Sequence, residues 1–408
     1  MKSYLNRQSI YAVIFIAVLF SFSIKNIMQE YPILSQTLQG LGSIDSAESL
    51  KSTIKHVDKN INDELLWKKQ FMEGYGYLQV LMGKNEFNNF AYVKDDNGFF
   101  NYASLYSKSD PLIEEYAKRI ARLKESVEKK GTKVMFISPP SKSIAEVSKN
   151  SEELEIQDHN PLQNEFLYDL YRNGVDYLDL RKPLLQSNIP KQDLFYKTDH
   201  HWTSQAAFVS FVAIVEKMKN LYGVDLDTNG FYSNLDNYSQ RTYKNNLLGS
   251  QGRDTGINYS GLDDFTLIWP KFPTNFTYDS TDNYGNKVHR EGSFDQSLLT
   301  PQALSHESDI YEVSSYDTFT DGVRAWNKIV NTNNPKGPKI LMIRDSFSNP
   351  LEAFLSPLCS EVDAIWPLAK SGNVDVEKYL QDNEFDYVFV ILYPGNIDGN
   401  GINFFKKN

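Results

Sequence analysis

The chain begins with a strongly apolar stretch that precedes any alternation of helices and strands. Residues Ile10–Ile24 (IYAVIFIAVLFSFSI) contain no charge and only two serines. The stretch has no polar face, which argues against a helix packed on a folded core. It is shorter than the roughly 17–25 residues usual for a membrane span. We expect an uncleaved membrane anchor; a signal peptide cleaved near Ser21-Phe22-Ser23 is the alternative.

The charges around this stretch predict its orientation. Lys2 and Arg7 precede it and Lys25 follows it. Basic residues before an apolar segment hold the N-terminus in the cytoplasm. We therefore expect a single-pass protein of the cell membrane with its folded part on the extracytoplasmic side. The predicted organisation is an anchor or signal segment over residues 1–28, a polar stalk over 29–84 and a folded domain over 85–408.

From about residue 110 onward, helical periodicity alternates with short apolar runs of strand length. One helix is predicted before Gly131, a second before Gly174, and a third from its N-cap Thr203 to Gly223. The predicted strands are Lys133–Ile137, Val175–Leu180, Lys339–Ile343, Val362–Trp366 and Tyr387–Leu392. This alternation predicts an α/β fold with a mostly parallel sheet and helices on both faces.

Two regions depart from this alternation of helices and strands. Asn97-Gly98 lies between apolar and aromatic residues, which predicts a β-hairpin over Phe90–Ala103. Residues from about 224 to 338 are rich in Asn, Asp, Ser, Thr and Tyr and show few helical patterns. We interpret that region as an insertion into the α/β domain, either loop-rich or β-rich.

Composition narrows the class of protein. The 408 residues carry a net charge of −10, and 41% of them are hydrophobic. A full core is therefore possible, whereas a nucleic-acid surface would need clustered Lys and Arg. Cys359 is the single cysteine of the sequence, so neither an internal disulfide nor a cysteine metal cluster can form.

Residues suited to catalysis follow the predicted strands. Ligands of open α/β sheets bind beyond the carboxyl ends of the strands. Ser346 comes shortly after one strand and Asn396 shortly after another, while Asp199 and His201 stand directly before a helix. Together these residues supply a nucleophile, an oxyanion donor, an orienting acid and a base.

The chemistry needs this combination. A serine hydroxyl attacks only when a base takes its proton, and a carboxylate orients the imidazole that does so. In extended backbone Asp199 and His201 point to the same side, so we expect His200 to point away. The Ser346 N–H and the Asn396 side chain are possible oxyanion donors. Each motif alone is also compatible with a simple turn or helix entry.

The sequence TDHHWT (Thr198–Thr203) resembles the signature of the DHHW proteins, which group with SGNH-hydrolase-like O-acetyltransferases of exopolysaccharide modification. The resemblance extends from about Tyr92 to the C-terminus. Its supporting segments are FISPPSK (136–142), VDYLDLR (175–181), LLGSQGRDTG (247–256) and ILMIRDSFSNP (340–350). It implies an SGNH-hydrolase-like fold in which Ser346 is the nucleophile, His201 the base and Asp199 the orienting acid.

The match is permuted and departs from the family in two places. Asp345-Ser346 resembles the first SGNH block, but it follows the Asp/His pair in the chain and has Arg344 where that block has glycine. The segment ending in Asn396 resembles the block that supplies an oxyanion asparagine, but Ile397 stands where the family has Asp. Gly252 is a second oxyanion candidate, from the character of its loop.

Substrate contacts are expected close to these motifs. The candidate substrate-binding residues are Arg344, Arg253, Tyr393 and Trp202. The region 224–338 also contains many tyrosines and phenylalanines. These rings either stack on sugar faces or simply pack the region.

The resemblance implies an enzyme that moves acetyl groups onto sugar hydroxyls outside the membrane. The implied partners are a polysaccharide acceptor and a membrane-bound O-acyltransferase that delivers acetyl. No cofactor and no resident metal are expected, and the sequence contains no GxxxxGK[ST] phosphate-binding loop.

Three other functions fit the same residues. The triad with water as acceptor would be a carbohydrate acetylesterase, because the acyl-enzyme step is shared. Asp199, His200 and His201 could hold a metal ion, although adjacent histidines rarely reach one ion. A membrane-anchored glycan-binding subunit without activity is the third alternative.

Overall fold

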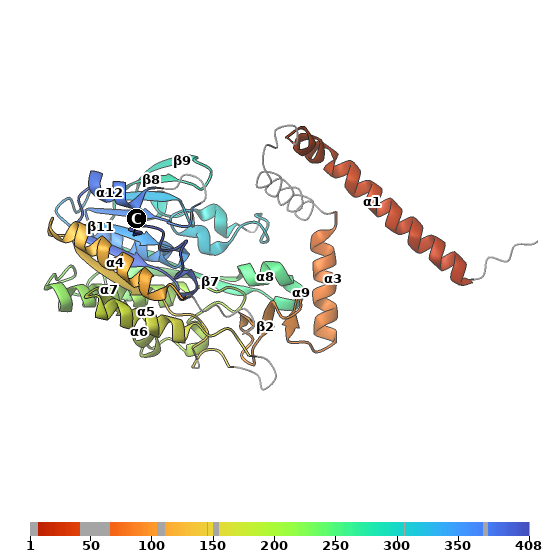
Figure 1. Cartoon of the computed structure of the whole chain (residues 1–408), viewed down its shortest axis with the longest axis horizontal. Helices are drawn as coiled ribbons and strands as arrows, with labels where there is room; N and C mark the ends of the chain where they lie inside the picture. Colours follow the sequence, from red (N-terminus) through yellow and green to blue (C-terminus); the bar gives the residue numbers. More distant parts are fainter. Residues whose placement is uncertain are drawn as a thin grey trace, which may run out of the picture. The chain divides into compact units, whose positions relative to one another are not determined.

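The computed structural model describes residues 7–40, 66–103, 111–144, 146–149, 155–305, 307–369 and 374–407. The chain divides into two units, Met1–Leu78 and Gln79–Asn408 (Figure 1). The smaller unit holds α1 (Arg7–Gly40) and most of α3 (Lys68–Leu81). The larger unit holds the sheet and the predicted site.

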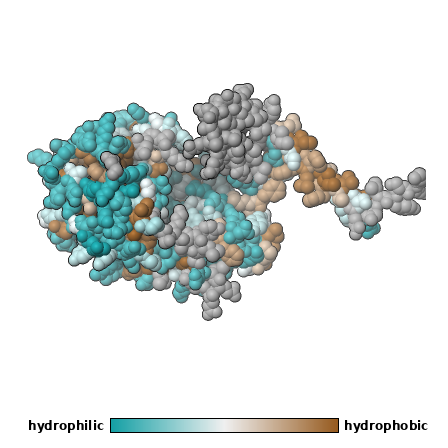
Figure 2. All heavy atoms as spheres, viewed as in Figure 1, coloured by the Kyte–Doolittle hydropathy of each residue, from teal (hydrophilic) through white to brown (hydrophobic). Residues whose placement is uncertain are grey.

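The apolar N-terminal stretch is part of helix α1. Within it, Ser9–Asn26 is long and apolar enough to cross a membrane, and none of it is buried. Its apolar surface is the brown band in Figure 2. A signal sequence would satisfy the same criteria. Residues 41–65 of the predicted stalk lie outside the described residues.

The larger unit is built on an eight-stranded sheet with the order β5-β4-β13-β11-β12-β10-β8-β9. Its first five strands are parallel. They are β4 (Lys133–Ser138), β5 (Asp176–Asp179), β11 (Lys339–Arg344), β12 (Glu361–Ile365) and β13 (Tyr387–Ile391). The predicted α/β fold class is confirmed, and each predicted strand falls on one of these.

The region 224–338 extends this sheet with antiparallel strands, so the sheet as a whole is mixed. The three added strands are β8 (Phe276–Thr281), β9 (Lys287–Gly292) and β10 (Trp326–Asn331). β10 pairs with β12 on one side and with β8 on the other. Two further strands, β6 (Tyr238–Leu247) and β7 (Asp263–Pro270), form a separate antiparallel pair.

Helices cover both faces of the sheet, as the alternating pattern predicted. One face packs against α4 (Ile113–Glu128), α5 (Asn160–Arg172) and α12 (Val376–Asp382). The other packs against α6 (Arg181–Leu185), α7 (Ser204–Tyr222) and α11 (Asn349–Leu355). Val134 lies in the first core and Met135 in the second. Both faces of β4 are buried, which explains its continuous apolar sequence.

The remaining elements are short. β1 (Glu86–Phe87), β2 (Tyr92–Lys94) and β3 (Phe100–Tyr102) form a small antiparallel sheet. The pairing of β2 with β3 confirms the hairpin, and Gly98 takes the left-handed φ of +83° in its turn. The short α-helices are α8 (Ser250–Thr255), α9 (Ile257–Ser260) and α10 (Phe294–Ser297). The 3₁₀ helices are Lys191–Asp193, Leu235–Asn237, Pro301–Leu304, Ser315–Thr318, Ser346–Ser348, Ser356–Leu358 and Pro394–Asn396.

Candidate active site

Ser346 lies at a strand-to-helix junction on the carboxyl edge of the sheet. Strand β11 ends at Arg344, and Ser346 begins the 3₁₀ turn that leads into α11. The carboxylate of Asp345 caps this turn by accepting a hydrogen bond from the Phe347 N–H at 3.1 Å. Ser346 is partly exposed, whereas Phe347 is buried. The turn therefore presents the hydroxyl while its neighbour anchors the backbone.

Three residues from two distant segments of the sequence form one hydrogen-bonded row. The Ser346 Oγ lies 2.6 Å from the His201 Nε2. The His201 Nδ1 lies 2.5 Å from the Asp199 Oδ1. The structure thus brings together the predicted nucleophile, base and acid in the order that serine acylation requires.

The Asp199 carboxylate is buried and held by backbone N–H groups. It accepts hydrogen bonds from the His201 N–H at 2.9 Å and from the Ser250 N–H at 2.7 Å. Burial works against the charged form, but the adjacent His201 and His200 and the hydrogen bonds outweigh it, so the pKa of Asp199 lies well below its usual value. An ionised carboxylate is the form that stabilises an imidazolium.

A close backbone approach keeps Asp199 in place. A Cβ added to Gly249 would lie 2.3 Å from both the Asp199 Cβ and the Thr198 carbonyl oxygen. The Gly249 N–H also donates to the Thr198 Oγ1 at 2.9 Å. Only glycine lets the start of α8 come this near to the loop that carries the acid.

Gly252 does not occupy the role expected of it. Its N–H donates to the Thr198 carbonyl at 2.9 Å, so this donor is already used and does not point to Ser346. A Cβ at this position would lie 2.7 Å from the Leu248 Cδ1. The prediction of Gly252 as an oxyanion donor is wrong: this glycine permits close packing of α8.

Aromatic rings enclose His201. Tyr316 stacks on its ring at a centroid distance of 4.2 Å, and Phe347 lies at 4.9 Å. Tyr316 comes from the region 224–338 and was not identified from the sequence, because nothing in its local motif distinguishes it from a packing tyrosine. The rings fix the imidazole plane so that both of its nitrogens keep their partners.

His200 does not point away from its neighbour as expected. Its ring lies 4.0 Å from that of His201, and its Nδ1 is 3.3 Å from the Ser250 Oγ. Burial, and after it the neighbouring His201 side chain, lower the pKa of His200 to about 3, although 32% of its side chain is exposed. His200 is therefore neutral and adds no positive charge beside the base.

Asp345 joins the nucleophile turn to the loop after β13. Its Oδ2 accepts hydrogen bonds from the Tyr393 N–H at 2.6 Å and from the Asn396 Nδ2 at 2.8 Å. An amide carries two N–H donors, and this bond uses one of them. This bond joins Asn396 to the turn that carries Ser346, and the role of Asn396 as an oxyanion donor stays a prediction.

Two predicted substrate contacts lie inside the protein. Arg344 is fully buried, with its Nε 2.5 Å from the Glu352 Oε1. Trp202 is fully buried and packs edge-on against Phe347 at 5.3 Å. Neither side chain can reach a substrate, so these two predictions are wrong. The sequence shows that these residues follow a strand or precede a helix, but not which way their side chains point.

The other two candidates lie at the surface of the site. Tyr393 stacks on Phe347 at 5.0 Å, and its hydroxyl lies 3.3 Å from the Ser141 Oγ. Arg253 is partly exposed on α8, and its charge contributes to the low pKa of His200. Tyr393 also lines a polar hollow of about 20 Å³, room for roughly one water. His159, Lys142 and Gln251 share this lining.

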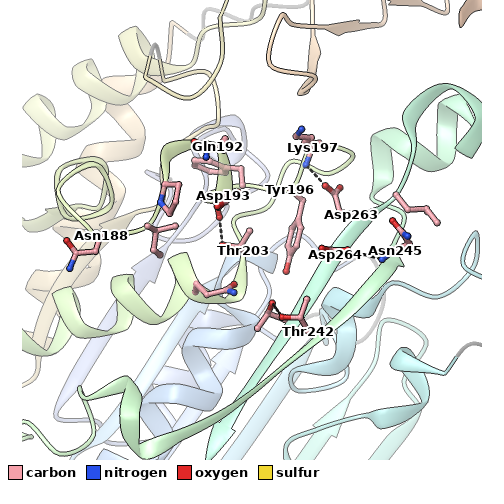
Figure 3. A pocket seen from close by; sticks show the side chains of 16 residues that line it. Asn188, Gln192, Asp193, Tyr196, Lys197, Thr203, Thr242, Asn245, Asp263 and Asp264 are labelled. Carbon is pink, nitrogen blue, oxygen red and sulfur yellow. Dashed lines mark hydrogen bonds between the residues drawn. The ribbon is translucent and has the colours of Figure 1, made fainter.

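A much larger cavity of about 730 Å³ lies beside the loop of residues 195–203, which carries Asp199 and His201 (Figure 3). Tyr196, Lys197 and Thr203 line it, but none of the predicted site residues does. Asp263 in its wall accepts hydrogen bonds from the Lys197 N–H at 3.0 Å and the Thr198 N–H at 2.8 Å. This wall supports the loop that carries Asp199 and His201.

The geometry also bears on the metal alternative. Ligand atoms of Asp199, His200 and His201 lie within 4.8 Å of one another. However, the two ring nitrogens of His201 contact Asp199 and Ser346. A metal ion bound by His201 would have to displace one of them.

The larger unit has an SGNH-hydrolase-like fold, with a serine-histidine-aspartate row at the carboxyl edge of its mixed α/β sheet. Residues 95–247 match the family model described as the SGNH hydrolase-like domain of the acetyltransferase AlgX. The resemblance expected from the sequence is thereby confirmed. A search of curated proteins gives no match.

Two solved structures share the fold. PatB1 from Bacillus cereus, with a sulfonyl adduct, is 20% identical over 77% of this chain and 97% of its own, with a TM-score of 0.60. A DHHW family protein from Eubacterium siraeum is 17% identical over 76% of this chain and 97% of its own, with a TM-score of 0.56. Both support the SGNH-hydrolase-like fold.

The two adjacent histidines should differ in their effect on acyl transfer. We expect His201→Ala to slow acylation of Ser346 by an activated acetyl ester about 10²–10⁴-fold, because the base is lost. His200→Ala should slow it by much less. Stopped-flow release of nitrophenol from nitrophenyl acetate measures both rates. Equal losses in two variants that unfold at the wild-type temperature would contradict the assignment.

Gly249→Ala should damage the site, whereas Gly399→Ala should not. The added methyl group at position 249 overlaps the backbone of Asp199, and relieving such an overlap typically costs ~1–3 kcal/mol. At position 399 the nearest atom is the Tyr116 hydroxyl at 3.4 Å, an ordinary contact. Urea unfolding and the acylation rate are measured for both variants. Equal behaviour of the two would show that the close approach is unimportant.

Proposed function

We propose that this chain is an extracytoplasmic O-acetyltransferase that moves acetyl groups onto hydroxyls of an exopolysaccharide or cell-wall glycan through an acyl-Ser346 intermediate. The observation that carries the proposal is the row in which Ser346 contacts His201 at 2.6 Å and His201 contacts Asp199 at 2.5 Å. The match of residues 95–247 to an acetyltransferase domain supports acetyl as the transferred group.

In the first step the Ser346 Oγ attacks the carbonyl carbon of an acetyl donor while the His201 Nε2 takes its proton. Asp199, ionised and bonded to the His201 Nδ1, stabilises the imidazolium. The oxyanion accepts hydrogen bonds from the Ser346 N–H and the Asn396 amide. His201 then returns the proton to the leaving group, and acetyl-Ser346 remains.

In the second step a sugar hydroxyl occupies the place of the leaving group. His201 removes its proton, the sugar oxygen attacks the acetyl carbon, and the bond to Ser346 breaks. The proton returns to Ser346 and the acetylated glycan departs. With water in place of the sugar, the same groups perform ester hydrolysis, which is the acetylesterase alternative.

In the proposal, helix α1 determines where the reaction takes place. Residues 1–28 anchor a single-pass protein in the cell membrane, 29–84 link it to the domain, and 85–408 carry the site outside the cytoplasm. A membrane-bound O-acyltransferase partner supplies acetyl, and Arg253 and Tyr393 contact the polysaccharide. No cofactor and no resident metal enter either step.

The nucleophile can be identified by mass spectrometry on the full chain in detergent. Phenylmethylsulfonyl fluoride should add one sulfonyl group to the Ser346 peptide, with fluoride leaving, and none to Ser346→Ala. Nitrophenyl acetate should leave acetyl on the same peptide because its phenolate is a good leaving group. EDTA should not change either reaction, whereas loss of both with EDTA would favour the metal site.

Discharge of the acetyl group separates the remaining functions. Addition of an oligosaccharide acceptor should speed the loss of acetyl from Ser346 and leave it on the sugar. Loss to water alone, at a rate that the acceptor does not change, would establish the esterase. Absence of any adduct on a folded wild-type chain would overturn the proposal and favour a glycan-binding subunit.

A further inference from the structure

Helix α3 exposes an apolar stripe. Phe71, Tyr75 and Leu78 recur at helical spacing and are 55%, 44% and 54% exposed. Trp67 lies directly before the helix, with a left-handed φ of +63°, and is 51% exposed. Gly76, between them in the sequence, is buried. A helix at the surface of a water-soluble domain turns its apolar stripe inward. A contiguous exposed stripe of this kind marks a contact with a partner or a membrane.

The contacts between α3 and α1 indicate whether the stripe faces a partner or a membrane. Phe22 stacks on Trp67 at 5.9 Å and meets Phe71 edge-on at 5.6 Å. The Asn26 Oδ1 accepts a hydrogen bond from the Leu66 N–H at 2.8 Å. Phe22 and Asn26 lie at the C-terminal end of the apolar segment Ser9–Asn26. The start of α3 is therefore attached where a spanning α1 would leave the bilayer.

We infer that the stripe from Trp67 to Leu78 lies in the headgroup region of the bilayer that α1 spans. Trp and Tyr prefer this region, and basic residues such as Lys68 and Lys69 favour a helix that lies in it. The occupant of the stripe is thus lipid. The inference rests on the proposed retention of α1 as an anchor.

Spin labels on the full chain in phosphatidylcholine–phosphatidylglycerol nanodiscs test this position. The native Cys359 is fully buried, so labels attach to introduced cysteines. Phe71→Cys and Leu78→Cys probe the stripe. Tyr168→Cys and Tyr171→Cys on α5, where the native side chains are 60% and 69% exposed, are the matched controls. Accessibility to oxygen reports lipid, and accessibility to a water-soluble nickel chelate reports water.

Labels at 71 and 78 should be relaxed more by oxygen than by the nickel chelate, and the control labels should show the reverse. Water-like values at 71 and 78, in a chain that remains in the discs, would overturn the inference alone. A chain that leaves the discs when detergent is removed would overturn the anchor, and the inference with it.

A second, independent observation concerns Lys142. This side chain is buried, and its Nζ donates to the Asp199 carbonyl at 2.7 Å, the Gln251 Oε1 at 2.8 Å and the Lys197 carbonyl at 3.3 Å. Three acceptors match the three N–H groups of an ammonium ion. Burial of an ammonium on neutral acceptors is costly, so a specific role is expected.

The three acceptors belong to the parts that hold Asp199. Lys197 and Asp199 lie in one loop, and Gln251 lies on α8, which also donates the Ser250 N–H to the Asp199 carboxylate at 2.7 Å. Lys142 itself follows strand β4. We propose that Lys142 is a positioning residue that fixes Asp199, and through it the ring of His201, by a charge-assisted bond to the Asp199 carbonyl. This proposal rests on the proposed function.

The charge state of Lys142 gives the proposal a pH signature. Burial lowers the pKa of Lys142 to about 7, although the carboxylates of Asp199, Asp263 and Asp95 oppose the shift. The imidazole of His200 also faces this ammonium. Between this pKa and the ordinary value of 10.5, the unfolded chain binds more protons, so this group makes the fold more stable as pH rises. The neutral amine has one donor fewer, so activity should fall as the pH rises through about 7.

Lys142→Met and Lys142→Arg in the full chain test this role. For acetyl transfer from nitrophenyl acetate, Lys142→Met should lower kcat about 10²-fold, because a small misplacement of catalytic groups has that effect, and leave KM nearly unchanged. The loss of activity that the wild-type chain shows as the pH rises through about 7 should be absent in Lys142→Met. Lys142→Arg, which keeps the charge, should retain more activity and move that loss to higher pH. Wild-type kcat and an unchanged pH profile in Lys142→Met would overturn the proposal.

Proton NMR gives a readout that does not depend on acetyl transfer. The His201 Nδ1–H bonded to Asp199 should give a low-field resonance in the wild-type chain and in Lys142→Arg. In Lys142→Met that resonance should shift or broaden while thermal unfolding stays cooperative. An unchanged resonance in Lys142→Met would overturn positioning by Lys142, even if Ser346 proved unreactive.

Discussion

The site depends on one carboxylate that stays ionised inside the protein. Asp199 is only 3% exposed, so it has lost most of its hydration. Charge-assisted bonds from the His201 ring and from two backbone N–H groups replace it, and they hold the pKa of Asp199 well below its usual value. The close approach of Gly249 serves this same group, because a bulkier residue would push the Ser250 N–H away from it.

A second buried carboxylate, Asp345, organises the other half of the site, and its pKa is shifted in the opposite direction to that of Asp199. Asp345 accepts hydrogen bonds from Phe347, Tyr393 and Asn396, yet burial raises the pKa of Asp345 above its usual value. Asp199 is bonded to the ring of His201, which favours its charge, whereas Asp345 relies mainly on backbone and amide donors. Asp199 is therefore suited to stabilising an imidazolium, and Asp345 to joining two loops around Ser346.

The sequence predicted the parts of this architecture that local patterns determine. Strands β4, β11 and β13 are buried on both faces, so each is a continuous apolar run, and the acid-base pair is recognisable because Asp199 and His201 are close in the chain. Strands β8 and β10 alternate buried and partly exposed residues within a polar region, and β9 alternates exposed and partly exposed ones. Their place in the sheet depends on the pairing of β10 with β12, of β8 with β10 and of β9 with β8.

The direction of individual side chains was the second feature that the sequence did not predict. Arg344 and Trp202 belong to recognisable motifs, but their burial depends on α11 and Phe347, which pack on them in three dimensions. Lys142 and Tyr316 meet Asp199 and His201 from segments about 57 and 115 residues away in the chain, and no local periodicity signals such contacts. The one sequence feature that could have identified Lys142 is its place in FISPPSK, a segment that carries the family resemblance.

The exposure of Ser346 bears on the balance between transfer and hydrolysis. The serine is partly exposed at the edge of the sheet, while its neighbours in the turn are buried. A hydroxyl of a long polymer can approach such a serine without entering an enclosed pocket. The same openness admits water, so the triad alone cannot favour a sugar over water. In the proposed function, preference for a glycan acceptor comes from binding that places its hydroxyl at His201 more often than water reaches that position. Arg253 and Tyr393, at the surface beside the histidines, are the described candidates for that binding.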